Sequence, residues 1–274
     1  MTLRRLRAWC AGPLSLLVAC ARCDPPPPPP RPRLPTLEVS PDPSAPASGR
    51  RVVAVGQIAQ TWHIGAWAPA SVTLAEVAAG DAIVVLGAYW GDLVAGSSTE
   101  PTDDHGALQR VLDQGPAIVG RKKPPVFAQL YVELDAAPGR HTIVPPYLGG
   151  PAGDGTLYVA QVRGLTERRV IATGEARLTG SRIPELAVAL DSAAEPGDLV
   201  LALAAYDNVE PRDHTGFSHP PQGWSALGLN DDAANNVPSE LCDRVAAAQG
   251  RQELTWTWTD PSVNVATAVI AALR

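Results

Sequence analysis

Two short clusters of acidic and histidine residues carry the side chains that could bind a metal ion or exchange protons. The first is Asp103-Asp104-His105, and the second holds Asp207, Asp213, His214 and His219. Carboxylates and imidazoles are common zinc ligands and general acids or bases. His214 and His219 lie five residues apart in a Pro- and Gly-containing stretch rather than at helical spacing, so we interpret both clusters as solvated loops. The sequence therefore predicts no catalytic residue, metal or cofactor. The alternative is that these residues belong to a metal-assisted or acid–base hydrolase.

Other catalytic signatures are missing from the sequence. It contains no Gly-x-Ser-x-Gly elbow, no His-Glu-x-x-His pair, no P-loop and no dinucleotide-binding turn. His141, in Gly139-Arg140-His141-Thr142, begins an expected strand and is interpreted as structural.

Tryptophan is unusually frequent, with seven residues against two phenylalanines. Flat rings can stack on the C–H faces of sugars, which makes tryptophans at strand ends candidates for a polysaccharide-binding surface. Trp256 and Trp258 share one face of an expected strand, and Trp224 follows a rigid Pro-Pro turn, so we expect these three in the core. The predicted ligand-binding residues are Trp62, Trp67, Tyr89, Trp90, Tyr206 and Asp207.

The N-terminus has the pattern of a cleaved export signal. Arg4, Arg5 and Arg7 precede a mostly apolar stretch that ends at Ala19. That stretch is shorter than the roughly 18 residues needed to cross a bilayer, and Gly12-Pro13 weakens a helix there. Residues 1–19 are therefore expected to be a signal peptide rather than a permanent anchor.

The end of this stretch, Leu17-Val18-Ala19-Cys20, resembles the lipobox of bacterial lipoproteins. The resemblance implies lipidation of Cys20, including palmitate, and a cell-envelope protein held on a membrane. Ala21 at the second mature position implies the outer membrane. Two alternatives stay open, namely cleavage after Ala21, which gives a secreted protein, and twin-arginine export through Arg4-Arg5.

A proline-rich segment follows the lipobox. Residues 20–49 contain six consecutive prolines, Pro25–Pro30, and further prolines beyond them. Such a sequence adopts polyproline II or is disordered. At ~3.1 Å per residue, residues 24–49 span up to about 80 Å. It predicts a stalk between the lipid and a domain formed by residues 50–274.

Charge and cysteine usage restrict the partners. The chain has 22 basic and 28 acidic residues, and six of the arginines precede residue 34, so the domain is strongly acidic and nucleic acid is not an expected partner. Of the four cysteines, Cys10 lies in the signal peptide and Cys20 would carry lipid. Cys242 is expected to be a buried thiol, although pairing with Cys23 in an oxidising envelope is the alternative.

Beyond residue 50, short runs rich in Val, Ile, Leu, Thr and Ala alternate with Gly, Pro and Asp, which is typical of antiparallel β-structure. Residues 107–112 are expected to form one helical turn, and residues 239–249 are read as a strand. The other expected strands are Val52–Val55, Ser71–Ala75, Ala82–Trp90, Val126–Glu133, His141–Val144, Leu157–Val162, Ala187–Asp191, Leu199–Tyr206, Leu254–Thr259 and Val265–Ala272.

The segment that begins at Gly80-Asp81 aligns without gaps to the one that begins at Gly197-Asp198, and two later strands echo each other in the same order. The pattern predicts an all-β, antiparallel two-sheet sandwich of jelly-roll type with two pseudo-symmetric halves, or convergence of two similar turns. The order of features also resembles secreted bacterial β-sandwich modules of unknown activity. We therefore expect a non-catalytic module that binds polysaccharide; a structural domain that packs on another envelope protein is a further alternative.

Overall fold

The computed structural model describes residues 53–63, 71–90, 100–106, 108–114, 126–145, 154–207, 216–217, 220–231, 237–258 and 263–274. All of them lie in the second of two compact units of the chain, Ser44–Arg274. The predicted signal peptide, Cys20 and the stalk lie outside the described residues. Every regular element in the described ranges is a β-strand, which confirms the all-β prediction. The same ranges hold no helix that could span a membrane.

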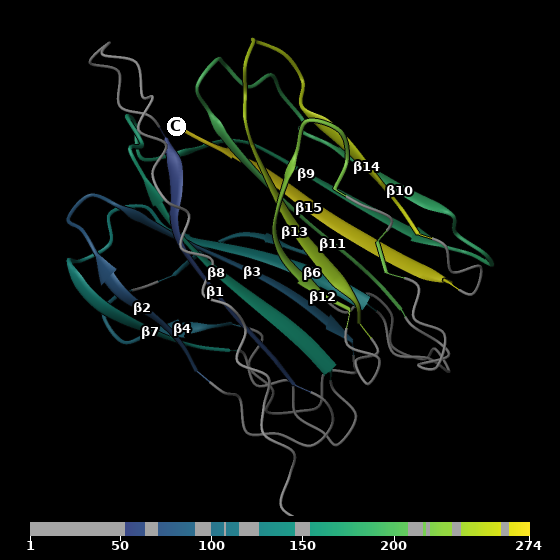
Figure 1. Cartoon of the computed structure of the whole chain (residues 1–274), viewed down its shortest axis with the longest axis horizontal. Helices are drawn as coiled ribbons and strands as arrows, with labels where there is room; N and C mark the ends of the chain where they lie inside the picture. Colours follow the sequence, from purple (N-terminus) through teal and green to yellow (C-terminus); the bar gives the residue numbers. More distant parts are fainter. Residues whose placement is uncertain are drawn as a thin grey trace, which may run out of the picture. The chain divides into compact units, whose positions relative to one another are not determined.

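Two five-stranded antiparallel sheets form the centre of this unit (Figure 1). The first has the order β1 (Ala54–His63), β8 (Asp154–Arg163), β3 (Ala82–Trp90), β6 (Val126–Glu133) and β5 (Gln109–Asp113). The second has the order β12 (Ser225–Asn230), β13 (Ser239–Val245), β11 (Leu199–Tyr206), β15 (Val265–Leu273) and β9 (Val170–Thr179).

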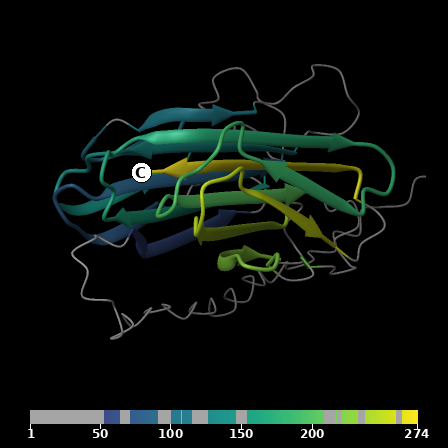
Figure 2. The same ribbon diagram turned by 90° about the horizontal axis from the view of Figure 1, so that it is seen from above.

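Two smaller sheets cover the outer faces of the large ones, so the unit has four layers (Figures 1 and 2). The sheet of β2 (Val72–Val77), β7 (Gly139–Val144) and β4 (Thr102–Asp103) packs on the first large sheet, and β10 (Glu185–Ala189) with β14 (Glu253–Thr257) packs on the second. The sequence predicted two sheets. The outer pair is required because β3 and β11 are apolar along their whole length and are buried on both faces.

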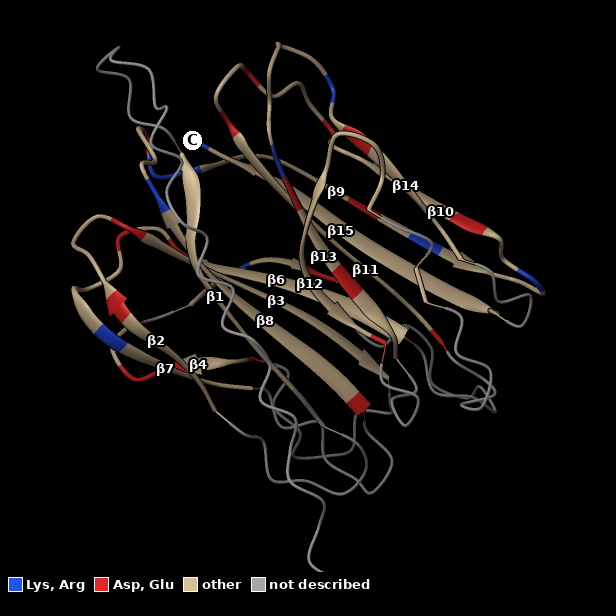
Figure 3. Ribbon diagram, in the orientation of Figure 1, with Lys and Arg blue, Asp and Glu red and all other residues tan. Residues whose placement is uncertain are grey.

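Three apolar cores separate the four layers. The central core joins the two large sheets through side chains such as Leu86, Leu130 and Leu203. The outer cores use the opposite faces of the same strands, for example Val85 in β3 and Val200 in β11. Charged residues are dispersed along strands and turns of the described part (Figure 3). Burial of both faces of the central strands therefore organises the whole unit.

The two halves of the unit repeat one topology. The order β1-β8-β3-β6-β5 becomes β9-β15-β11-β13-β12 when each strand is replaced by its counterpart, and β2-β7 becomes β10-β14. The sequence echo is therefore structural pseudo-symmetry. The finer jelly-roll assignment stays a prediction.

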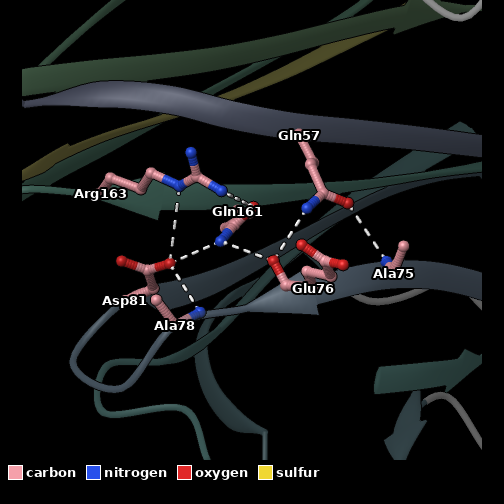
Figure 4. Close-up of polar contacts among 7 residues, drawn as sticks. All are labelled: Gln57, Ala75, Glu76, Ala78, Asp81, Gln161 and Arg163. Atoms are coloured by element: carbon pink, nitrogen blue, oxygen red, sulfur yellow. Dashed lines mark hydrogen bonds and ion pairs between the residues drawn. The ribbon is translucent and has the colours of Figure 1, made fainter. Parts of the chain in front are cut away.

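The turn before β3 is held by a network around Asp81 (Figure 4). The backbone N–H of Ala78 donates to Asp81 Oδ2 at 3.0 Å, and Gln161 Nε2 donates both to Asp81 Oδ2 and to the carbonyl oxygen of Glu76. Arg163 Nε lies 3.7 Å from the same carboxylate, with half of its side chain exposed. The network ties the last strand of this half, β8, to the turn that starts β3.

The same network recurs before β11. Gly80 and Gly197 have φ of 86° and 95°, a conformation that glycine adopts without strain. The backbone N–H of Glu195 donates to Asp198 Oδ2 at 2.6 Å, as Ala78 does in the first half. Arg274 donates through Nε to Asp198 Oδ1 at 2.8 Å and through a terminal nitrogen to Oδ2 at 3.0 Å. The repeat thus extends to side-chain contacts, with a tighter ion pair in the second half.

Four edge strands escaped the sequence prediction, one of which is the two-residue β4. The expected helical turn at residues 107–112 is wrong, because Gln109–Asp113 pairs with β6 as β5. β9 and β12 were also missed, and both are edge strands with mixed burial patterns. An edge strand is only half covered, so its apolar periodicity is weak. Residues 239–249 were correctly read as a strand, which ends at Val245.

Candidate functional site

Most of the predicted ligand-binding residues gather at one end of the two large sheets. Trp62 lies opposite Thr156 in the first sheet, close to the end of β3 at Trp90. Asn230, which ends β12, donates to Thr156 Oγ1, and pairing through β13 places Asn230 near the last residue of β11, Tyr206. We call this end, defined by Trp62, Trp90, Thr156, Tyr206 and Asn230, the rim.

Several rim and neighbouring residues are packed or bonded inside the fold. Tyr89 is 1% exposed, and its ring centroid lies 5.4 Å from that of Phe127. Tyr206 stacks on Trp258 at 5.1 Å. Asp207, 4% exposed, accepts hydrogen bonds through Oδ1 from two backbone N–H groups at the start of β15, at 2.8 and 2.7 Å. These three residues stabilise the end of the sheets.

Trp90 is the predicted ligand-binding side chain that the structure places in a partly buried position at the rim. The backbone of Trp62 belongs to β1, whereas its side chain and the whole of Trp67 lie outside the described residues. Trp224, Trp256 and Trp258 are buried, as predicted for core residues. Cys242 is a free, fully buried thiol, also as predicted.

A second constellation forms where β4 pairs with β7. The Nδ1 atom of His141 lies 2.6 Å from Asp103 Oδ2, and both side chains are fully buried. The other ring nitrogen, Nε2, lies 2.7 Å from the carbonyl oxygen of Ala137. Because a carbonyl only accepts, Nε2 carries a proton and donates it to Ala137. The ring is thus fixed in orientation at both nitrogens.

Three further residues surround this pair. Glu133 at the end of β6 brings a carboxylate oxygen close enough that oxygens of Asp103 and Glu133 and a ring nitrogen of His141 all lie within 4.8 Å of one another. The ring of exposed His105 has its centroid 4.8 Å from that of His141. Asp104 Oδ1 accepts the backbone N–H of Thr142 at 2.7 Å. We call Asp103, Glu133 and His141 the acid–histidine cluster.

The electrostatics of the cluster follow from burial and crowding. Burial, then the hydrogen bond and charge of Asp103, raise the pKa of Glu133 to about 7. Burial opposes a charged His141, but the hydrogen bonds to Ala137 and Asp103 outweigh it and raise the pKa of the ring. The backbone N–H of Thr142 lowers the pKa of Asp104 to about 2. The raised pKa values favour the uncharged form of Glu133 and the charged form of His141.

The acid–histidine cluster and the rim are separate places. Glu133 lies opposite Ile83 at the start of β3, whereas the rim lies at Trp90. The intervening strand covers roughly 23 Å. The structure does not bring Asp103 and Asp207 together, and Asp213, His214 and His219 lie outside the described residues. With a fully buried ring whose two nitrogens are occupied, the cluster is not poised for proton exchange with a substrate.

Sequence reasoning named Asp103, treated His141 as structural and overlooked Glu133. The sequence held one signal that His141 has a polar partner. Alternation in β7 puts His141 on the same face as Ile143, and both are buried. A histidine on the apolar face of a strand requires a polar partner.

Neither protein-family models, nor curated proteins, nor solved structures match this chain.

Another buried acid provides a comparison for the cluster. Glu240 in β13 is 3% exposed and lies opposite Ala204, the counterpart of Gly87 in the first half. Gln129 lies opposite Gly87, so the repeat places an amide where the second half has a carboxyl group. Burial raises the pKa of Glu240. The fold thus accommodates a buried polar side chain at this position in both halves.

Proposed function

We propose that the chain is a cell-envelope lipoprotein, anchored through Cys20, whose β-sandwich unit binds polysaccharide at the rim without catalysis. The anchor rests on Leu17-Val18-Ala19-Cys20 after a basic and apolar leader. Lipid on this cysteine would hold the protein on a membrane. By the rule for the second mature residue, which here is Ala21, that membrane would be the outer one. The stalk would hold the unit away from the lipid surface.

The binding role is supported by one observation above all. Trp90 is partly buried at the rim, which also contains the backbone of Trp62 and the end of the facing sheet. A tryptophan fixed on a strand end offers a rigid apolar face for a sugar ring. The non-catalytic reading is supported by the burial of the acid–histidine cluster far from the rim.

The rim is tested by binding of the purified full chain to an array of bacterial polysaccharides. We expect Trp90→Ala to weaken binding at least about tenfold, because the stacking face is lost. Trp90→Phe keeps a ring and is expected to retain part of the affinity. Binding by Trp90→Ala equal to that of the unchanged protein, with both variants folded by circular dichroism, would contradict the rim as the binding site.

A further inference from the structure

The acid–histidine cluster has no part in the proposed polysaccharide site, and its geometry points to another ligand. We propose that Asp103, Glu133 and His141 bind a zinc ion. Their three ligand atoms lie within 4.8 Å of one another and come from three different strands, β4, β6 and β7. One imidazole nitrogen with carboxylate oxygens is a donor set that zinc accepts.

The orientation of His141 suits a metal ligand. Its Nε2–H donates to the carbonyl oxygen of Ala137, which leaves Nδ1 directed at Asp103. Histidines that bind metals commonly donate their second N–H to a backbone carbonyl, which fixes the tautomer and the ring plane. The ring is therefore held with its second nitrogen, Nδ1, facing the carboxylate of Asp103.

An unsatisfied hydrogen-bond acceptor in the cluster also favours a cation. Two acidic side chains face one imidazole, and Glu133 Oε2 is buried without a hydrogen-bond donor in the described part of the chain. A buried carboxylate oxygen with no partner is costly. A divalent cation between the three side chains would supply the missing partner.

The distances require only small movements. Zinc bonds of about 2.0–2.1 Å in a tetrahedron place ligand atoms about 3.3 Å apart. Asp103 Oδ2 and His141 Nδ1, now 2.6 Å apart, would open slightly, and the most distant pair would close from at most 4.8 Å. Gly106 lies against the carboxylate of Glu133, and a Cβ at this position would overlap that carboxylate. The nearby ring of His105, or a water molecule, could complete the coordination.

The test is zinc binding by the full chain after treatment with chelator. We expect one zinc ion per chain, with a dissociation constant of micromolar or lower, and a melting temperature that rises by several degrees when zinc is added. Asp103→Asn and Glu133→Gln keep the shape of each side chain and are expected to weaken zinc binding at least about tenfold. Glu240→Gln, which removes another buried carboxyl group in the second half, should bind zinc like the unchanged protein.

Two results would overturn the zinc site. One is a protein that holds no stoichiometric zinc at about 100 µM metal and melts at the same temperature with and without it. The other is unchanged binding by both cluster variants, which would assign the zinc to other histidines. If neither variant folds, the unchanged protein still tests the zinc site. Chelator must then lower its melting temperature, and zinc, but not magnesium, must restore it.

Discussion

Replacing Asp198 with alanine is expected to lower the free energy of unfolding by about 3 kcal/mol, one of the two largest effects that the structure predicts. Asp198 is 2% exposed and receives two hydrogen bonds from Arg274, whose side chain is 17% exposed. It also accepts the backbone N–H of Glu195. Removal leaves the mostly buried Arg274 guanidinium with only Glu195 and Glu167, at 3.0 and 3.6 Å, as acidic partners. It also leaves the turn without its hydrogen bond.

The repeat provides the control for this variant. Asp81→Ala removes the same turn contact, but its arginine, Arg163, lies 3.7 Å away with 51% of its side chain exposed. Gln161 keeps its hydrogen bond to the carbonyl of Glu76 after the change. We expect a loss of about 2 kcal/mol, measured for both variants by urea unfolding. Equal losses would contradict the inference that the second ion pair is the stronger one.

Replacing Gly174 with alanine is expected to cost about 3 kcal/mol or more, or to prevent folding. Gly174 lies in β9 opposite Ile270, and a Cβ at this position would overlap the carbonyl oxygen of Ala189 and lie 2.9 Å from Ile270 Cγ2. The obstacle is backbone at the end of β10, so no side-chain rotation relieves it. The outer sheet of β10 and β14 would have to move away from β9.

Gly180→Ala is the matched control, because a Cβ there meets no atom within 4 Å. Its effect on the free energy of unfolding should stay within about 0.5 kcal/mol. Thermal and urea unfolding of the two variants, compared with the unchanged protein, measure the difference. Similar stability of both variants would mean that β10 does not approach β9 as closely as the structure places it.

The strands that the sequence predicted best are those whose local pattern and tertiary role agree. β3 and β11 have the predicted bounds because their uninterrupted apolar runs are buried on both faces. The edge strands β5, β9 and β12 carry mixed polar and apolar residues and are defined by their pairing partners. The apolar runs of β3 and β11 suggested that both faces of these strands are buried. The sequence did not show that two outer sheets cover them.

The acid–histidine cluster shows where sequence reasoning ends. Asp103 belongs to a strand of two residues, too short to give a periodic signal, and meets His141 only through the pairing of β4 with β7. Glu133 joins them from the end of β6. Contacts between residues that lie 30 and 38 positions from Asp103 depend on strand pairing, which local pattern does not determine.

Metabolic labelling with radioactive palmitate in a bacterial host tests the lipid anchor at Cys20. The full chain is expected to incorporate label and to sediment with membranes, whereas Cys20→Ala should lose both. Cys23→Ala, which removes a thiol three positions later, should be labelled like the unchanged protein. Labelling that persists in Cys20→Ala, or an unlabelled protein cleaved after Ala21, would contradict the lipid anchor.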